Sequence, residues 1–144
     1  MVASIFSFFT YGQSDYILSN LDSSKGDYAK IAMQIWEYAE MGYQEKKSSA
    51  LLQNKLKESG FLVKAGVAGI PTAFVAEYNN GGPIIAILGE YDALPGLSQK
   101  ALPYKITNGG RGGHACGHHL FGTASAAAAI SLKKYIIKHR IKGT

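Results

Sequence analysis

Apolar positions recur along this chain with two different periods, which predicts a mixture of helices and strands. Between residues 25 and 40 the apolar side chains return every three or four positions, so we expect a helix there, preceded by the capping side chains of residues 22–24. A second helix is expected from residue 48 or 49 to Gly60, with its leucines directed inward, because glycine suits the left-handed position that ends a helix. The first third of the chain is therefore predicted to be helical.

The middle of the chain has the composition of strands. Residues 62–65 predict a short strand, and residues 72–78 alternate in polarity and are rich in strand formers. The turn sequence at 79–82 (NNGG) leads into 83–89 (PIIAILG), which is apolar on both faces. Such a run is typical of a strand inside a sheet that helices cover on both sides.

The last third of the chain predicts a loop and then a helix. Residues 96–113 are rich in glycine and polar side chains, and loops of this length are often functional. A helix of small residues is expected to begin near His118 and to press closely on a sheet, with a basic, solvated end over 133–142. Helices that alternate with strands predict an α/β fold.

Composition excludes several classes of protein. The chain has 144 residues, of which 47% are hydrophobic, so it is long enough and apolar enough for one folded domain. Its net charge of +5 is concentrated near the C-terminus without interleaved aromatics, which argues against nucleic-acid binding. No apolar run approaches the roughly 20 residues that span a membrane. A single cysteine excludes an intramolecular disulfide.

The N-terminal residues admit two interpretations. The apolar stretch at 2–9 (VASIFSFF) is similar to the end of a signal peptide that lacks a basic leading region, but it also fits an amphipathic or frayed segment. We therefore divide the chain into an N-terminal segment, 1–20, and a domain, 21–144. The expected location is cytoplasmic, and a periplasmic or secreted location is the alternative if residues 1–14 are a signal-peptide remnant.

The strongest chemical signal lies at residues 113–119 (GHACGHH), which hold the only cysteine and three of the four histidines. Cys116 and His118 are two residues apart and could both reach one metal ion, since thiolate and imidazole suit zinc and its neighbours. A small buried cysteine beside histidines at a helix start would give the same pattern. A cysteine nucleophile paired with His118 or His114 ranks lower, because no oxyanion-hole signature accompanies it.

Two acids follow the apolar run at 83–89. Glu90 and Asp92 could supply oxygen ligands or orient a histidine, although a strand end is also where solvated charges are common. For Glu40 and Glu45 we expect ordinary solvated carboxylates.

Three motifs together resemble the amidohydrolase and aminoacylase branch of the dinuclear-metal peptidases. They are residues 36–45 (WEYAEMGYQE), 91–95 (YDALP) and 113–118 (GHACGH). Residues 67–72 (VAGIPT) and 89–99 (GEYDALPGLSQ) are most similar to the group of p-aminobenzoyl-glutamate hydrolase B subunits. The resemblance runs from about residue 25 to the C-terminus.

The resemblance implies part of a zinc-peptidase-like catalytic domain with a mixed sheet flanked by helices. It implies two divalent ions, zinc or manganese, with Cys116 and His118 as ligands and Asp92 as a catalytic residue that supports the metal site. Glu90 stands where many relatives outside this branch have a ligand histidine, and His119 stands where relatives have Asp or Asn. Glu90, His114 and His119 are thus expected to hold ligands in place or contact substrate.

The resemblance also implies what the complete enzyme would need. A pair of adjacent glutamates, further histidine ligands and a smaller dimerisation domain lie downstream in the family, so the chain is expected to be a C-terminally truncated, inactive fragment. The complete enzyme would be a homodimer that cleaves the amide bond of N-acyl or N-aroyl amino acids, such as p-aminobenzoyl-glutamate, or of dipeptides. The alternative is a non-enzymatic α/β module that binds or complements another chain through an exposed sheet edge.

Overall fold

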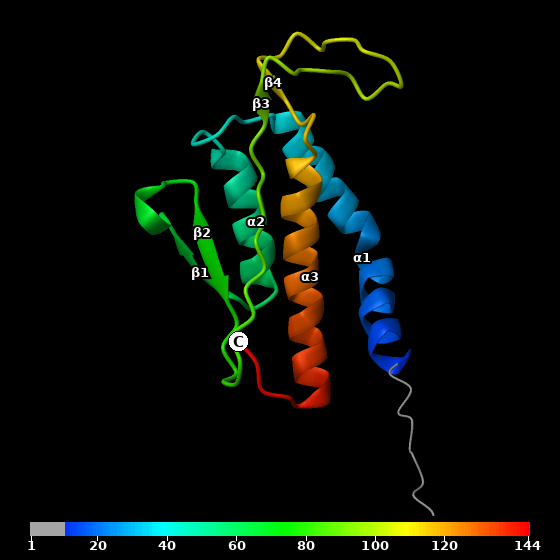
Figure 1. Cartoon of the computed structure of the whole chain (residues 1–144), viewed down its shortest axis with the longest axis vertical. Coiled ribbons are helices and arrows are strands. Elements are labelled where there is room, and N and C mark those ends of the chain that lie inside the picture. The colour runs from blue at the N-terminus through cyan, green and yellow to red at the C-terminus, as the bar shows by residue number, and fades with distance from the viewer. Residues whose placement is uncertain (1–10) are drawn as a thin grey trace, which may run out of the picture.

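A computed structural model describes residues 11–144, in which three helices lie side by side with a β-hairpin on one flank (Figure 1). In chain order the elements are α1 (Tyr11–Tyr38), α2 (Lys46–Glu58), β1 (Leu62–Ala65), a 3-10 turn (Val67–Gly69), β2 (Phe74–Glu77), β3 (Leu94–Pro95), β4 (Gly112–Gly113) and α3 (His118–His139). The apolar stretch at 2–9 lies outside the described residues. Within 11–144, no helix combines the length and apolarity needed to cross a membrane.

Helix α1 begins well before the predicted position. It runs continuously through residues 22–24, so the cap expected there is wrong. Contacts with the end of α3 explain the longer helix, since the ammonium group of Lys138 lies 3.7 Å from the ring centre of Tyr16. The ring of Tyr16 also lies 6.2 Å from that of Tyr135. Tertiary packing of this kind overrides a local capping preference.

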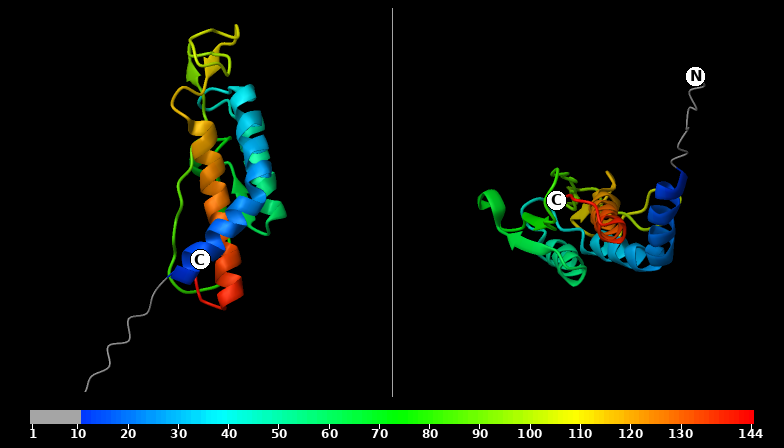
Figure 2. Two further views of the ribbon diagram at one scale, coloured as in Figure 1. Left: turned by 90° about the vertical axis from the view of Figure 1, so that its right-hand side faces the viewer. Right: turned by 90° about the horizontal axis from the view of Figure 1, so that it is seen from below.

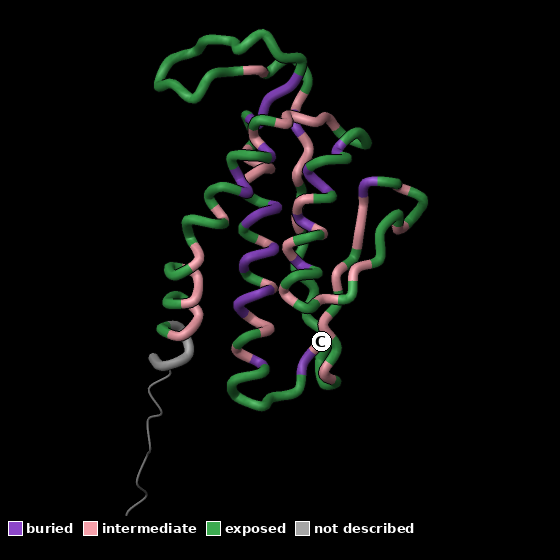
Figure 3. Tube along the Cα trace, turned by 180° about the vertical axis from the view of Figure 1, so that it is seen from behind, coloured by how far each residue is buried: buried purple, intermediate pink, exposed green. Residues whose placement is uncertain are grey.

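The hydrophobic core lies where the three helices meet. Its buried members are Ile31, Ile35, Leu52, Leu56, Ala126 and Ile130, two from each helix. Ile35 is completely buried. The α3 members of the core are the small Ala126 and the larger Ile130. Figure 3 shows the buried positions on the facing sides of the helices, whereas the loop beyond β3 is almost entirely exposed. The predicted inward positions of Leu52 and Leu56 are confirmed.

The carboxylate of Glu40 caps the start of α2 and that of Glu45 is buried just before it, so the expectation that both are simply solvated is wrong. Both carboxylate oxygens of Glu40 accept hydrogen bonds from the N–H of Lys47, at 3.0 Å, and one also accepts from the N–H of Ser48 at 2.8 Å. Glu45 is only 7% exposed and accepts from the hydroxyl of Thr72 at 2.7 Å. These bonds satisfy donors that would otherwise be unpaired.

The strands form two small antiparallel sheets. In one, β1 pairs with β2 in a register that places Leu62 opposite Glu77, which confirms the strand predicted at 62–65 and the core of the one predicted at 72–78. In the other, β3 pairs with β4 at the base of the long loop. The predicted combination of helices and strands is therefore present.

Residues 83–89 do not form the predicted buried strand. They are extended but belong to no ladder, and Ile84 and Leu88 are 80% and 72% exposed. The segment covers one side of α3 while α1 packs on the other (Figure 2). A strand is buried on both faces only when neighbouring strands and a second helix layer surround it. Within the described residues only one face is covered, so the apolar pattern alone was misleading.

Helix α3 begins at His118 as predicted and ends at His139. Its basic end is only partly solvated. The ammonium group of Lys133 donates to the carbonyl oxygens of Ser59 and Gly60, the latter at 2.9 Å, and lies 5.3 Å from the ring centre of Phe61. A cation is favoured at this position, because the last carbonyl groups of α2 carry partial negative charge.

Candidate metal site

Small residues on α3 allow residues 88–92 to pack closely against this helix, next to the candidate site. A Cβ atom at Gly122 would lie 2.6 Å from the carbonyl oxygen of Glu90, and one at Gly89 would lie 3.1 Å from the Cβ of Ser125. The hydroxyl of Ser125 donates to the carbonyl of Leu88 at 2.6 Å. These contacts fix residues 88–92 against the first two turns of α3, where His118 is located.

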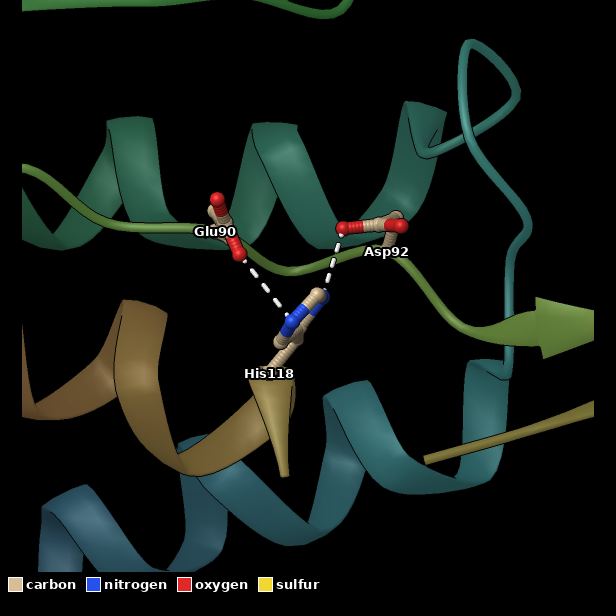
Figure 4. A group of neighbouring side chains, drawn as sticks. All are labelled: Glu90, Asp92 and His118. Atoms are coloured by element: carbon tan, nitrogen blue, oxygen red, sulfur yellow. Dashed lines mark hydrogen bonds and ion pairs between the residues drawn. The ribbon is translucent and has the colours of Figure 1, made fainter. Parts of the chain in front are cut away.

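Glu90, Asp92 and His118 converge on one point (Figure 4). Nδ1 of His118 lies 2.8 Å from Oδ1 of Asp92, and Nε2 lies 3.0 Å from Oε2 of Glu90. The two acids are two residues apart on an extended segment, so their side chains project to the same side. Gly117, with a φ of +87°, precedes the helix and aims His118 at them.

The electrostatics of this group favour a cation. A neutral imidazole has one N–H donor, so it can satisfy only one of two carboxylates that flank it. The side chain of His118 is 19% exposed, against 32% for Asp92 and 47% for Glu90. Two carboxylates thus share one partly buried ring, and a metal ion beside them would balance their charge.

The donor set fits a divalent ion. One ligand atom from each of Glu90, Asp92 and His118 lies within 4.8 Å of the others. Nε2 of His118 and Oε2 of Glu90 lie 3.0 Å apart, so both residues would be able to contribute a ligand atom to one ion. Carboxylate oxygen and imidazole nitrogen suit zinc and manganese alike.

Cys116 is exposed and does not belong to this group. It lies in the turn between β4 and α3, two residues before His118. It is not the buried structural cysteine that the sequence also allowed. Its predicted role as a ligand remains a prediction, because the described geometry brings only His118 of the predicted pair to the acids.

His114 and His119 form a pair of neighbouring histidines. Their ring centres are 5.0 Å apart, and His114 is 4% exposed. Nε2 of His114 donates to the carbonyl of Ile35 at 3.0 Å, and among residues 11–144 neither its Nδ1 nor that of His119 has a hydrogen-bond partner. Burial lowers the pKa of both rings, and each ring lies beside other histidines whose charge also disfavours protonation. Both rings are therefore favoured as neutral groups.

Glu90 was expected to supply an oxygen ligand, to orient a histidine or to contact substrate, and it contacts the same imidazole as Asp92. Its two-residue spacing from Asp92 on an extended segment was the available signal. The sequence could not show that α3 packs against this segment, because that contact depends on the absence of a side chain at Gly122.

Comparisons with known proteins find relatives among hydrolases. The chain is 43% identical over 132 residues to the B subunit of p-aminobenzoyl-glutamate hydrolase from Escherichia coli (strain K12), covering 90% of this chain and 27% of that protein. It is 32% identical to the hippurate hydrolase of Campylobacter jejuni, covering 83% of this chain and 30% of that protein. It is 30% identical to the N-acetyl-L-cysteine deacetylase of Bacillus subtilis, covering 80% of this chain and 27% of that protein.

A solved structure shares the fold. It is described as an aminohydrolase of methicillin-resistant Staphylococcus aureus and superposes with a TM-score of 0.69 at 20% identity, over 83% of this chain and 31% of that one. No protein-family model matches the chain. The chain spans between about a quarter and a third of the length of these curated relatives. By sequence it nevertheless belongs to the amidohydrolase and aminoacylase branch of the dinuclear-metal peptidases.

Proposed function

We propose that this chain contributes metal ligands to an amidohydrolase that cleaves the amide bond of an N-acyl or N-aroyl amino acid, or of a dipeptide. The observation that carries the proposal is the imidazole of His118 held between the carboxylates of Glu90 and Asp92. The relatives named above are hydrolases and a deacetylase of such compounds by name. p-Aminobenzoyl-glutamate is the substrate we expect first.

Each residue of the site has a proposed task. Asp92 accepts the Nδ1 proton of His118, which fixes the orientation of the ring and makes Nε2 a better ligand. Nε2 of His118 and a carboxylate oxygen of Glu90 would hold a divalent ion between them, with the thiolate of Cys116 as a further ligand. When bound, such ions polarise the amide carbonyl and make a water molecule acidic near neutral pH.

The isolated chain is proposed to bind metal without turning over substrate. The family resemblance assigns the general base to one of two adjacent glutamates, and the sequence of 144 residues contains no such pair. The complete enzyme is proposed to be a cytoplasmic homodimer. N-terminal sequencing of the mature protein tests the location, because removal of the residues up to about 14 would favour the secreted alternative.

A chimaera tests the catalytic part. The matching region of the Escherichia coli hydrolase would be replaced by this chain, and release of p-aminobenzoate would be measured with and without a chelator. We expect hydrolysis that depends on metal and is lost on Cys116→Ala or His118→Ala. Asp22→Asn is the matched control, since the side chain of Asp22 is 77% exposed and distant from the site in sequence.

Metal binding by the isolated chain tests the site independently of the chimaera. Zinc and manganese content after dialysis would be measured for the native chain and for His118→Ala. A metal content that the substitution leaves unchanged would contradict the proposed ligand. Hydrolysis by the chimaera in the presence of a chelator would contradict the proposed chemistry.

A further inference from the structure

Three sequence motifs that lie far apart along the chain meet at one buried residue. Glu45 ends the motif WEYAEMGYQE, Thr72 ends VAGIPT and Tyr91 opens YDALP. Hydrogen bonds connect these three residues with Ser49, and we call the four of them the Thr72 network. The candidate metal site uses none of their side chains, so the network needs an explanation of its own.

Thr72 joins the other members of the network through both of its polar groups. Its hydroxyl donates to a carboxylate oxygen of Glu45 at 2.7 Å. Its carbonyl oxygen accepts from the hydroxyl of Ser49, at 2.6 Å, and also from the phenol of Tyr91. The network thus connects the start of α2 and the turn before β2 to the segment that carries the two acids of the candidate metal site.

The Thr72 network is buried although its groups are polar. Ser49, Thr72 and Glu45 are 2%, 6% and 7% exposed. Removing such groups from water is costly unless they are hydrogen-bonded, and apolar residues of similar shape would fill the same space without that cost. Hydrogen bonds have a preferred direction, which the burial of apolar surface does not. The network therefore indicates a need for orientation rather than for core volume.

Tyr91 stands between the two acids but uses the opposite face of the segment. Side chains alternate along an extended chain, so Glu90 and Asp92 both point toward His118, as Figure 4 shows, and Tyr91 points the other way. Its ring stacks on that of Phe74, with ring centres 6.0 Å apart, and its hydroxyl is held by the network. A rotation of the backbone that released this hydroxyl would turn both acids away from the imidazole.

Two further hydrogen bonds hold the segment on either side of Tyr91. The carbonyl of Leu88 accepts from the hydroxyl of Ser125 at 2.6 Å, and the N–H of Ala93 donates to the carbonyl of Glu40 at 2.7 Å. These bonds place the ends of the segment. The bond from Tyr91 lies between them, so the direction of the two neighbouring carboxylates depends on the network.

We propose that Thr72 and Tyr91 are positioning residues of the metal site, a role that rests on the tasks of Glu90 and Asp92 in the proposed function. Neither positioning residue supplies a ligand atom. They hold the segment from the face opposite His118 and so set the direction of both carboxylates. Without the network the acids would sample more orientations, and an ion would bind more weakly because more freedom is lost on binding.

Two substitutions at Thr72 separate its hydroxyl from its volume. Thr72→Val keeps the shape and removes the donor to Glu45, whereas Thr72→Ser keeps the donor. Tyr91→Phe removes the phenol hydroxyl directly. Lys133→Met is the matched control, because it removes hydrogen bonds to residues just beyond the opposite end of α2. It should cost stability without affecting the acids.

Zinc titration of the native chain and these variants provides the first measurement, under conditions in which urea unfolding shows each of them to be folded. We expect Thr72→Val and Tyr91→Phe to bind zinc about tenfold more weakly, and Thr72→Ser and Lys133→Met to bind it as the native chain does. A purely structural role would instead lower the stability of Thr72→Val and leave the zinc affinity of its folded molecules unchanged.

The Nδ1 proton of His118 provides a second measurement that needs no metal. Its bond to Asp92 should slow the exchange of this proton with water, so NMR of metal-free chain with ¹⁵N-labelled histidine should detect it. The signal is assigned by its absence in His118→Ala. It should persist in Thr72→Ser and be lost in Thr72→Val and Tyr91→Phe.

The two measurements separate a failure of this proposal from a failure of the proposed function. Zinc affinity and a ring proton that Thr72→Val and Tyr91→Phe both leave unchanged would overturn the positioning role and leave the metal site intact. A native chain that binds no zinc would contradict the proposed function, and the ring proton then decides the positioning role. A native chain with neither zinc nor the ring proton overturns both. If Thr72→Val fails to fold, Tyr91→Phe decides.

Discussion

The carbonyl oxygen of Glu90 lies 2.6 Å from the position that a Cβ atom would take at Gly122. No real Cβ atom tolerates a backbone oxygen at that distance, so a glycine at 122 is a condition for the close contact between residues 88–92 and α3. That contact brings both acids to His118, which makes a helix glycine part of the geometry of the candidate metal site.

Gly122→Ala should therefore displace Glu90 and weaken metal binding by about tenfold, even though alanine favours helices. Overpacking of this kind costs about 1–3 kcal/mol of folding free energy. Gly26→Ala is the matched control, since a Cβ atom there meets nothing within 4 Å, and it should stabilise α1. Zinc titration and urea unfolding of both variants provide the measurements. Equal metal affinity in the two variants would contradict the argument.

Asp92→Asn should lower metal affinity by about 10- to 100-fold without unfolding the chain, because the amide orients His118 less firmly and contributes no charge. The change is isosteric, so a loss of binding with unchanged thermal stability distinguishes an electrostatic role from a packing role. Calorimetric titration with zinc would detect the difference. Asp22→Asn should leave the affinity as it is.

Cys116 offers a direct test of the predicted thiolate ligand. It is the only cysteine of the chain and is exposed, so its reaction with a thiol reagent reports on one atom. We expect zinc to slow that reaction by about tenfold or more, since a coordinated thiolate is less available. A labelling rate that is the same with and without zinc would remove Cys116 from the site and leave the acids and His118 as ligands.

Glu40→Ala should destabilise the chain by about 1 kcal/mol, because the carboxylate replaces the missing partners of two N–H groups at the start of α2. Glu58→Ala, at the exposed opposite end of the same helix, should change the free energy of unfolding little. Urea unfolding at neutral pH compares the two. A cost for Glu58→Ala as large as that for Glu40→Ala would argue against the capping role.

Tyr91 should make the folding stability of the chain depend on pH, and the direction of this dependence can be stated. Burial raises the pKa of its phenol above the ordinary value of 10.0, and the hydroxyl donates to the carbonyl of Thr72. The unfolded chain therefore loses this proton first, so the stabilisation is present below pH 10 and is lost as the pH rises toward the folded-state pKa.

Tyr91→Phe removes that proton, and the variant should be less stable than the native chain by about 1 kcal/mol at neutral pH. The difference between the two should be constant below about pH 9 and shrink as the pH rises above about 10. Unfolding by urea across this range measures the difference directly, because titrations of other groups cancel. A difference that grows with pH would mean that the folded state does not favour the neutral phenol.

The sequence predicted features that depend on near neighbours. The helix containing Ile31 and Ile35, the strand at 62–65 and the start of α3 at His118 follow from periodicity, turn residues and composition. Contacts between distant residues were not predictable in this way. Glu45 is buried because Thr72, 27 residues further along, donates to it, and no local pattern marks that partner.

For residues 83–89 the sequence predicted burial that the structure does not show. Their apolar pattern on both faces favours a buried strand, but the pattern cannot show whether neighbouring strands are present to cover it. The contact of Glu90 with His118 was not predictable for a related reason, since it depends on a close approach that only a small helix residue permits.

The pairing with Thr144 and the acids of the candidate metal site lie on one extended segment. The N–H of Ile85 donates to the carbonyl of Thr144, and five residues later Glu90 reaches His118. An event that orders this backbone at one place leaves less entropy to be lost at the other. Binding of a metal ion and the pairing at Ile85 should therefore stabilise each other by the same factor.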